Sequence, residues 1–155
     1  MKIIAIVWVC VAVLSSSSWA QEGDYSIGAR SSGMAGSTVT VGDEWALFNN
    51  IGGLSYHTKQ SAMISYQSKF GISELSSMAA GYVHPIWNGT AGIGFFRFGS
   101  AQFSEQRAHL GFSNQFGIVS LGLNIGVYQL NIENFGSKQS LIIDFGGQAR
   151  LTDQL

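Results

Sequence analysis

The stretch GIVSLGLNIGVYQLNI, residues 117–132, decides the fold class of this chain. Apolar residues recur at every second position, and the residues between them are small or polar. The apolar set is Val119, Leu121, Leu123, Ile125 and Val127, and the other set is Ser120, Gly122, Asn124, Gly126 and Tyr128. Because successive side chains of a β-strand point to opposite faces, this alternation predicts a strand with one apolar face. Such a strand fits a water-soluble antiparallel sandwich or a transmembrane barrel whose apolar side faces lipid.

The same alternation continues through most of the chain after residue 59. Further strands are predicted at residues 62–67, 78–85, 90–98, 106–113 and 141–151. At residues 96–98 the pattern slips, as a bulge or an interfacial aromatic belt would make it. Short connections at 85–89 and 114–117 alternate with longer ones at 68–75, 99–105 and 131–139, as in barrels with short turns on one side of the membrane. We therefore predict an all-β protein, an antiparallel meander of about six strands.

Composition favours lipid over water around the apolar face. Only 11% of the 155 residues are charged, against about 25% in an average soluble domain, which is unfavourable for a soluble sandwich. The net charge of −1 gives no electrostatic case for nucleic acid as a partner. We predict part of a transmembrane β-barrel, with the lipid bilayer as a partner, and keep a secreted soluble β-sandwich binding protein as the alternative.

Polar side chains of the predicted strands fall opposite the apolar face, so they are expected to face the lumen, where charge is tolerated. These residues are Arg107, His109, Ser113, Asn124, Asp144, Gln148 and Arg150. One reading is a lining that contacts a solute or a plug. The other, which we favour here, is mutual salt-bridging that fills a narrow interior.

The first twenty residues have the organisation of a signal peptide. Lys2 supplies the positive start, residues 3–14 form an apolar run, and Ser18-Trp19-Ala20 supplies small residues for cleavage after Ala20. The run is too short to span a membrane as a helix. The one cysteine, Cys10, lies inside this run, so the predicted mature chain has no disulfide or thiol chemistry.

Residues 21–58 differ from the rest because they show no sustained period of two. We expect a compact, mostly irregular segment with one helical turn near residues 43–47, where Asp43 and Glu44 suit a helix start. A phosphate-binding loop at residues 28–36 is not supported, since it lacks the Gly-Lys-Ser/Thr ending.

Residues 28–55, GARSSGMAGSTVTVGDEWALFNNIGGLS, resemble the N-terminal segment of the FadL-like outer-membrane proteins, and more closely the PorV/PorQ-type branch found in Bacteroidetes. The positions that match the family pattern are Gly28, Arg30, Gly33, Gly36, Asp43, Asn50, Gly53 and Leu54. Two positions depart from it: Ile51 stands where proline is usual, and Gly52 stands where alanine is usual. The strand region, including residues 88–100 and 136–138, is also similar to this branch.

The resemblance implies a barrel in the bacterial outer membrane whose N-terminal segment folds into the lumen as a hatch. It divides the chain into a signal peptide (1–20), a hatch or plug segment (21–58) and a partial transmembrane β-barrel (59–155). It implies passage of hydrophobic compounds or protein export across the outer membrane. Alternatively, the protein is a type IX secretion accessory or scaffold, with secretion-system proteins as partners. Since single-chain barrels need about eight strands, we expect an N-terminal fragment or truncated product, or a sheet closed by self-association.

No catalytic, cofactor or metal site is predicted. The histidines His57, His84 and His109 lack ligand spacing and are expected to be lumen or turn residues. A triad of Ser113, His109 and Asp144 is imaginable across neighbouring strands, but the chain has no nucleophile elbow. We therefore expect a protein that is not an enzyme.

Overall fold

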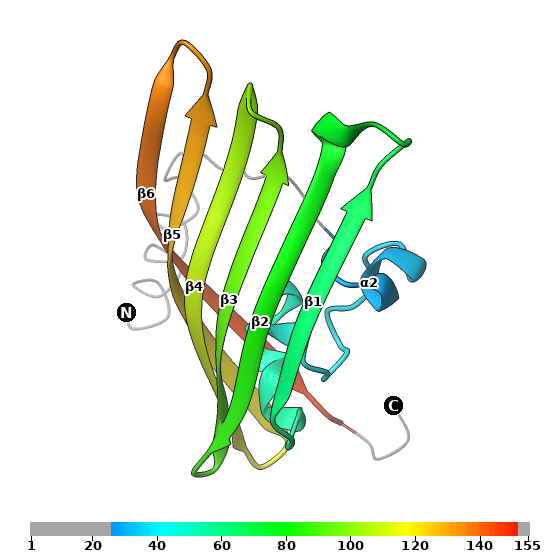
Figure 1. Ribbon diagram of the computed structural model, residues 1–155. Coiled ribbons are helices and arrows are strands. Elements are labelled where there is room, and N and C mark those ends of the chain that lie inside the picture. Colours follow the sequence, from blue (N-terminus) through cyan, green and yellow to red (C-terminus); the bar gives the residue numbers. More distant parts are fainter. Residues whose placement is uncertain (1–25, 152–155) are drawn as a thin grey trace, which may run out of the picture.

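The computed structural model describes residues 26–151, and the predicted signal peptide with its cleavage site lies outside the described residues. Within them, six strands form one antiparallel sheet in which each strand pairs with its neighbours along the chain (Figure 1). The strands are β1 (Ser61–Ser68), β2 (Ser76–Ile86), β3 (Gly89–Gly99), β4 (Phe103–Phe116), β5 (Val119–Ile132) and β6 (Gly136–Ala149). The predicted six-stranded antiparallel meander is confirmed.

The two faces of the sheet differ in the way that β5 predicts. Leu121, Leu123 and Ile125 are exposed on one face, whereas Ser120 and Asn124 are buried on the other. Strand β6 extends the exposed apolar face: Leu141, Ile143 and Phe145 keep 69%, 63% and 74% of their surface accessible. The apolar face is therefore uncovered within the described part of the chain. The buried side chains of β5 lie on the polar face.

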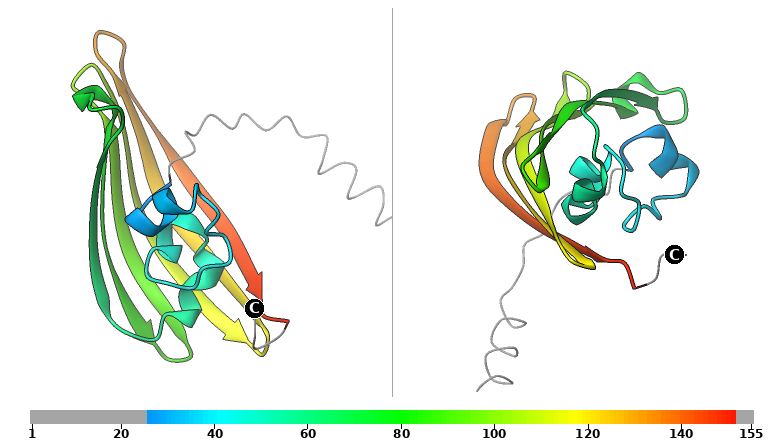
Figure 2. Two further views of the ribbon diagram at one scale, coloured as in Figure 1. Left: turned by 90° about the vertical axis from the view of Figure 1, so that its right-hand side faces the viewer. Right: turned by 90° about the horizontal axis from the view of Figure 1, so that it is seen from below.

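The sheet is curved, and it remains open. Its concave side wraps around the N-terminal segment (residues 26–58), and its convex side points outward (Figure 2). We call these sides the inner and the outer face. Strands β1 and β6 are the two ends of the strand order, and no pairing joins them within residues 26–151. The sheet has the curvature of a barrel wall but is not closed into a barrel.

The N-terminal segment contains more helix than the sequence pattern predicts. It forms α2 (Ala29–Gly33), α3 (Ala46–Asn49) and the 3-10 helix η1 (Ile51–Tyr56). The expectation of one helical turn in an otherwise irregular segment is therefore wrong in extent. Helices this short are not stable alone, and both α3 and η1 pack on the sheet. Within residues 26–151, no helix is long and apolar enough to cross a membrane.

The apparent slip at residues 96–98 is not a bulge. The β3–β4 pairing runs without interruption from Gly89↔Asn114 to Gly99↔Ser104. Phe96 points inward and packs in a buried cluster with Ile27 and Ala79, so the polarity of the two faces is exchanged while the backbone stays regular. An aromatic side chain fits the inner face here because an apolar residue of the N-terminal segment covers it.

The connections are shorter than predicted. Residues 100–102 and 133–135 join β3 to β4 and β5 to β6, so much of the expected loops at 99–105 and 131–139 is strand. The tight turns lie at 87–88 and 117–118. Only the connection between β1 and β2, residues 69–75, is long enough to hold a further 3-10 turn, η2 (Ser73–Leu75).

Candidate functional site

The contact between the N-terminal segment and the inner face is the most elaborate part of the molecule. Leu47 and Leu54 are completely buried, and Ile51 keeps 3% of its surface accessible. These three side chains pack with Met63 of β1 and Val83 of β2 in the main apolar cluster. Burial of a leucine side chain contributes roughly 1.5–3 kcal/mol. The segment is therefore docked by its own hydrophobic core.

Glycines on the inner face allow the segment to approach the backbone of the sheet. A Cβ atom on Gly122 of β5 would lie 2.6 Å from the carbonyl oxygen of Ile51. On the segment itself, a Cβ atom on Gly52 would lie 2.5 Å from the Cα atom of Gly147 in β6. Both distances are shorter than two such atoms can approach. Gly52 stands where the FadL-like pattern has alanine. The absence of a side chain at Gly52 thus allows η1 to pack directly against β6.

Two serines of the sheet hold one carbonyl group of the segment. Ser113 Oγ, from β4, donates to the carbonyl oxygen of Gly52 at 3.3 Å, and Ser120 Oγ, from β5, donates to the same oxygen. The Oγ atoms of Ser55 and Ser120 are 2.5 Å apart. These hydroxyls satisfy backbone groups of a short helix that has few internal hydrogen bonds.

Amide side chains bind further carbonyl groups of the segment. Asn124 Nδ2 donates to the carbonyl oxygen of Leu47 at 3.1 Å, and Gln148 Nε2 donates to that of Thr40 at 2.7 Å. We call Ser113, Ser120, Asn124 and Gln148 the inner-face latch. Each of the four side chains donates to a main-chain oxygen of the segment. Substitution of the segment's own side chains would leave these oxygens in place.

Arg150 and Asn50 add contacts at the end of β6. The guanidinium carbon of Arg150 lies 3.6 Å from the ring centroid of Tyr56, a cation–π distance. Asn50 Nδ2 donates to the carbonyl oxygens of Val39 and Gly147 at 2.6 and 3.3 Å. These contacts bind Asn124, Gln148 and Arg150 to the segment. Ser113 and Ser120 also bond to each other across the inner face, with their Oγ atoms 3.2 Å apart.

A polar cleft of about 730 Å³ remains between the segment and strands β4 to β6. Arg107 and Asp144 line it from the sheet, and Ser31 and Asn49 line it from the segment. Asn124 lies at its wall, with its Oδ1 atom buried and without a hydrogen-bond partner among the described residues. The cleft therefore suits water or a polar solute better than an apolar one.

His109 is buried beside this region with 4% of its surface accessible. Its ring packs edge-on against Phe48 of α3, with centroids 5.0 Å apart. Neither ring nitrogen has a hydrogen-bond partner among the described residues. The other two histidines are elsewhere: His57 bonds Ser61, and His84 lies on the outer face beside Tyr82. His84 is thus not a lumen residue.

The residues that match the FadL-like pattern have structural roles within the N-terminal segment. Gly28 has a φ of 96° under the indole of Trp45, where a side chain would clash, and Arg30 forms an exposed ion pair with Asp43 at 3.4 Å. Asp43 also accepts a hydrogen bond from the backbone N–H of Trp45 at 3.1 Å, just before α3.

The remaining positions of that pattern differ in how closely they are packed. Gly53 packs under Val41 and Leu54 is buried. Gly36 has a φ of 81°, which favours glycine, whereas a Cβ on Gly33 would meet open space.

Several residues of this contact were not among the predicted site residues. They are Leu47, Ile51 and Ser55 of the segment and Thr90, Ser120, Gly122 and Gly146 of the sheet. Thr90 Oγ1 donates to the carbonyl oxygen of His57 at 2.9 Å. The signal that could have found the sheet residues is their position, since all four are small and lie on the non-apolar side of their strands.

The described residues do not assemble the triad that was considered. Ser113 and His109 lie four residues apart on β4, about 13 Å along a strand, and Ser113 is bound to Gly52 instead. No cluster of histidine, cysteine, aspartate or glutamate within residues 26–151 has the arrangement of a metal site. No family model, curated protein or solved structure matches the chain.

Proposed function

We propose that this protein is an outer-membrane β-barrel protein, in which the sheet is part of the barrel wall and the N-terminal segment is a hatch in its interior. The observation that carries this proposal is the uncovered apolar outer face. In β5, Leu121, Leu123, Ile125 and Val127 all point outward and are 39–48% accessible. A soluble sandwich would cover this face with a second sheet, but the N-terminal segment packs on the opposite one.

The dimensions of the strands fit a bilayer. Strands β4, β5 and β6 have 14 residues each, more than the roughly 9–11 that a tilted membrane strand needs. Val119 to Val127 spans about 27 Å along β5, or about 20 Å across a bilayer at a tilt of about 40°. The apolar band of outer-membrane barrels is about 25 Å tall. In lipid the edges of β1 and β6 must also be paired, because unpaired backbone groups are costly there.

The role that we propose is passage of hydrophobic compounds, or of exported protein, past the hatch. The hatch occupies the concave side of the sheet, where a lumen would be, so passage requires it to move. The cleft that the hatch leaves open is polar, so an apolar route has to be created by displacement of the segment.

A second candidate is a secretion accessory or scaffold protein of the PorV kind, in which the hatch stays in place. The inner-face latch favours it, since four side chains of the sheet hold backbone groups of the segment and would all have to release together. The two candidates differ in one measurable property, which is whether the hatch leaves the inner face during function.

A reversible disulfide between the hatch and the wall tests this difference. The Oγ atoms of Ser55 and Ser120 are 2.5 Å apart, so the double variant Ser55→Cys/Ser120→Cys places two sulfur atoms near bonding distance. Flux of an apolar dye into vesicles that contain the protein is measured with the bond oxidised and after reduction. Passage past a moving hatch predicts low flux when oxidised and recovery when reduced.

The single variant Ser120→Cys is the matched control, because it cannot form this bond. Equal flux in the oxidised and the reduced double variant would contradict a moving hatch and support the scaffold. Recovery of the protein in the aqueous fraction of cells, without any in the outer membrane, would overturn both candidates.

A further inference from the structure

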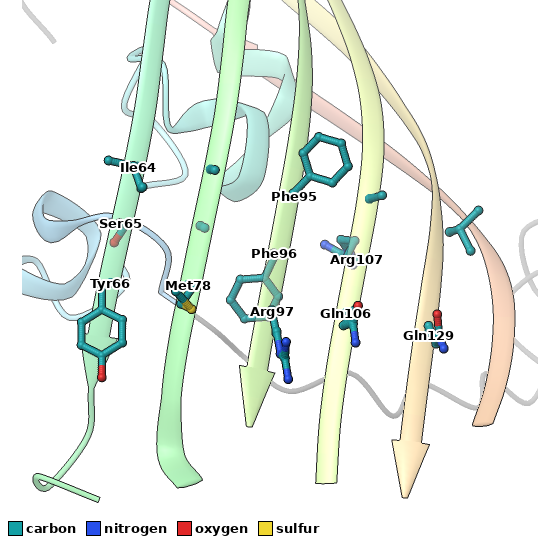
Figure 3. Close-up of a pocket in the computed structure, with 14 residues that line it drawn as sticks. Ile64, Ser65, Tyr66, Met78, Phe95, Phe96, Arg97, Gln106, Arg107 and Gln129 are labelled. Atoms are coloured by element: carbon teal, nitrogen blue, oxygen red, sulfur yellow. The ribbon is translucent and has the colours of Figure 1, made fainter. Parts of the chain in front are cut away.

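A hollow of about 390 Å³ lies on the outer face, on the side of the sheet away from the hatch. Figure 3 shows its lining, which crosses strands β1 to β5. The apolar part is made by Ile64, Met78, Phe95 and Val127. The small Ala108 side chain, which pairs with Phe95 across the strands, leaves room between the larger ones.

A polar row borders this hollow at one end. Arg97 of β3 pairs with Gln106 of β4, Gln106 pairs with Gln129 of β5, and Gln129 pairs with Gln139 of β6. Because paired residues share a face, all four side chains lie side by side on the outer face. The neighbouring row, two residues along each strand, contains Phe95, Ala108 and Val127 and is entirely apolar. The outer face of β3 to β5 therefore changes from apolar to polar between two neighbouring rows of side chains, two residues apart along each strand.

Arg97 brings a positive charge to this border without a protein counter-ion. It is exposed, and among residues 26–151 it has no ion-pair partner. A guanidinium group offers several N–H donors in a planar fork that matches the oxygens of a phosphate group. The apolar lining of the hollow beside Arg97 suits a hydrocarbon chain. A charged end next to an apolar groove complements an anionic amphiphile.

We propose that the outer hollow binds one anionic membrane lipid, with its phosphate at Arg97 and an acyl chain along Phe95 and Val127. Gln106 and Gln129 then donate to the remaining oxygens of the head group. The site rests on the proposed membrane location, because that location brings lipid to the outer face. It marks the polar row as the level of the lipid head groups, at one edge of the apolar band.

The test uses protein that is expressed from the full chain and extracted into detergent. Native mass spectrometry measures the binding of phosphatidylglycerol and of phosphatidylcholine with identical acyl chains. The proposal predicts tighter binding of phosphatidylglycerol, and about a tenfold loss of that affinity in Arg97→Gln, because charge-assisted hydrogen bonds are removed. Ala108→Trp fills the hollow and weakens binding without a change of charge.

Lys138→Gln is the matched control, because it removes one positive charge from an exposed position outside the hollow. An equal loss in Lys138→Gln and Arg97→Gln would show attraction to net charge and overturn the site. Competition by millimolar inorganic phosphate as strong as by the lipid would show a free-phosphate site and also overturn it.

Insertion into phosphatidylcholine vesicles separates this proposal from the proposed function. Retained insertion of all variants with no preference for the anionic lipid would refute the lipid site alone. Failure of the unmodified protein to insert would refute the membrane location and the lipid site together.

Discussion

An arginine placed at the centre of the outer face distinguishes lipid from water around this sheet. Leu123 is the middle one of the five alternating apolar residues of β5, and 40% of its surface is accessible. It points away from the hatch, so Leu123→Arg disturbs no contact of the inner face. Gln129, six residues along the same strand, lies on the same face in the polar row. The variant Gln129→Arg is therefore the matched control.

The cost of the arginine substitution in free energy of unfolding is expected to differ between lipid and water. In a bilayer, Leu123 lies about 20 Å along the strand from the polar row, or about 15 Å in depth at a tilt of about 40°. An arginine at the midplane costs about 2–4 kcal/mol, and one near the interface costs about 0–1 kcal/mol. In water, both exposed substitutions change the free energy of unfolding by about 0.5 kcal/mol or less. The difference between the two variants is thus about 1–4 kcal/mol in lipid and near zero in water.

Urea unfolding of protein that is folded into phosphatidylcholine vesicles measures this difference. Tryptophan fluorescence and the heat-dependent mobility of the protein on gels follow the transition. Equal stabilities of Leu123→Arg and Gln129→Arg would refute the assignment of the outer face to lipid, provided that the unmodified protein unfolds in one transition with the same slope. A larger cost for Gln129→Arg would place the middle of the bilayer elsewhere and refute the depth argument.

Two further predictions concern the contact of the hatch with the inner face. Gly122→Val places side-chain atoms against the carbonyl group of Ile51, and we expect a loss of about 1–3 kcal/mol with faster proteolysis of the hatch; Gly33→Ala, where a Cβ meets open space, should keep the hatch protected. Asn124→Ala removes the donor to the carbonyl oxygen of Leu47 and should cost about 1–3 kcal/mol, and exchange of the hatch amides with deuterium should accelerate. Unchanged proteolysis or exchange would show that the hatch is not held by these groups.

Strand positions were predictable because each strand carries its own signal. The alternation in β5 depends only on which side chains face the N-terminal segment and which face outward, so it is visible in one strand at a time. The six strands and their order follow from it together with short connections. The exchange of faces at Phe96 was not predictable, because it depends on Ile27, a residue that is distant in the sequence and packs against it.

The contact between the N-terminal segment and the sheet was predictable only in part. The polar side of the strands identified Ser113, Asn124 and Gln148, because polar residues opposite an apolar face must lie inside. Their partners were not predictable, since they are backbone carbonyl groups, and these carry no side-chain signal. The helix α2 was missed because its five residues are too few to show a helical period. The helical turn expected near residues 43–47 overlaps the start of α3.

By itself, the sequence determined that this chain forms a sheet with one apolar and one polar face, because the period of two is a local property of the backbone. Only the tertiary structure decided which face is covered. The N-terminal segment packs on the polar face through Leu47 and Ile51, close to the strands because Gly122 has no side chain. That choice leaves the apolar face open, since one segment cannot cover both sides of a sheet.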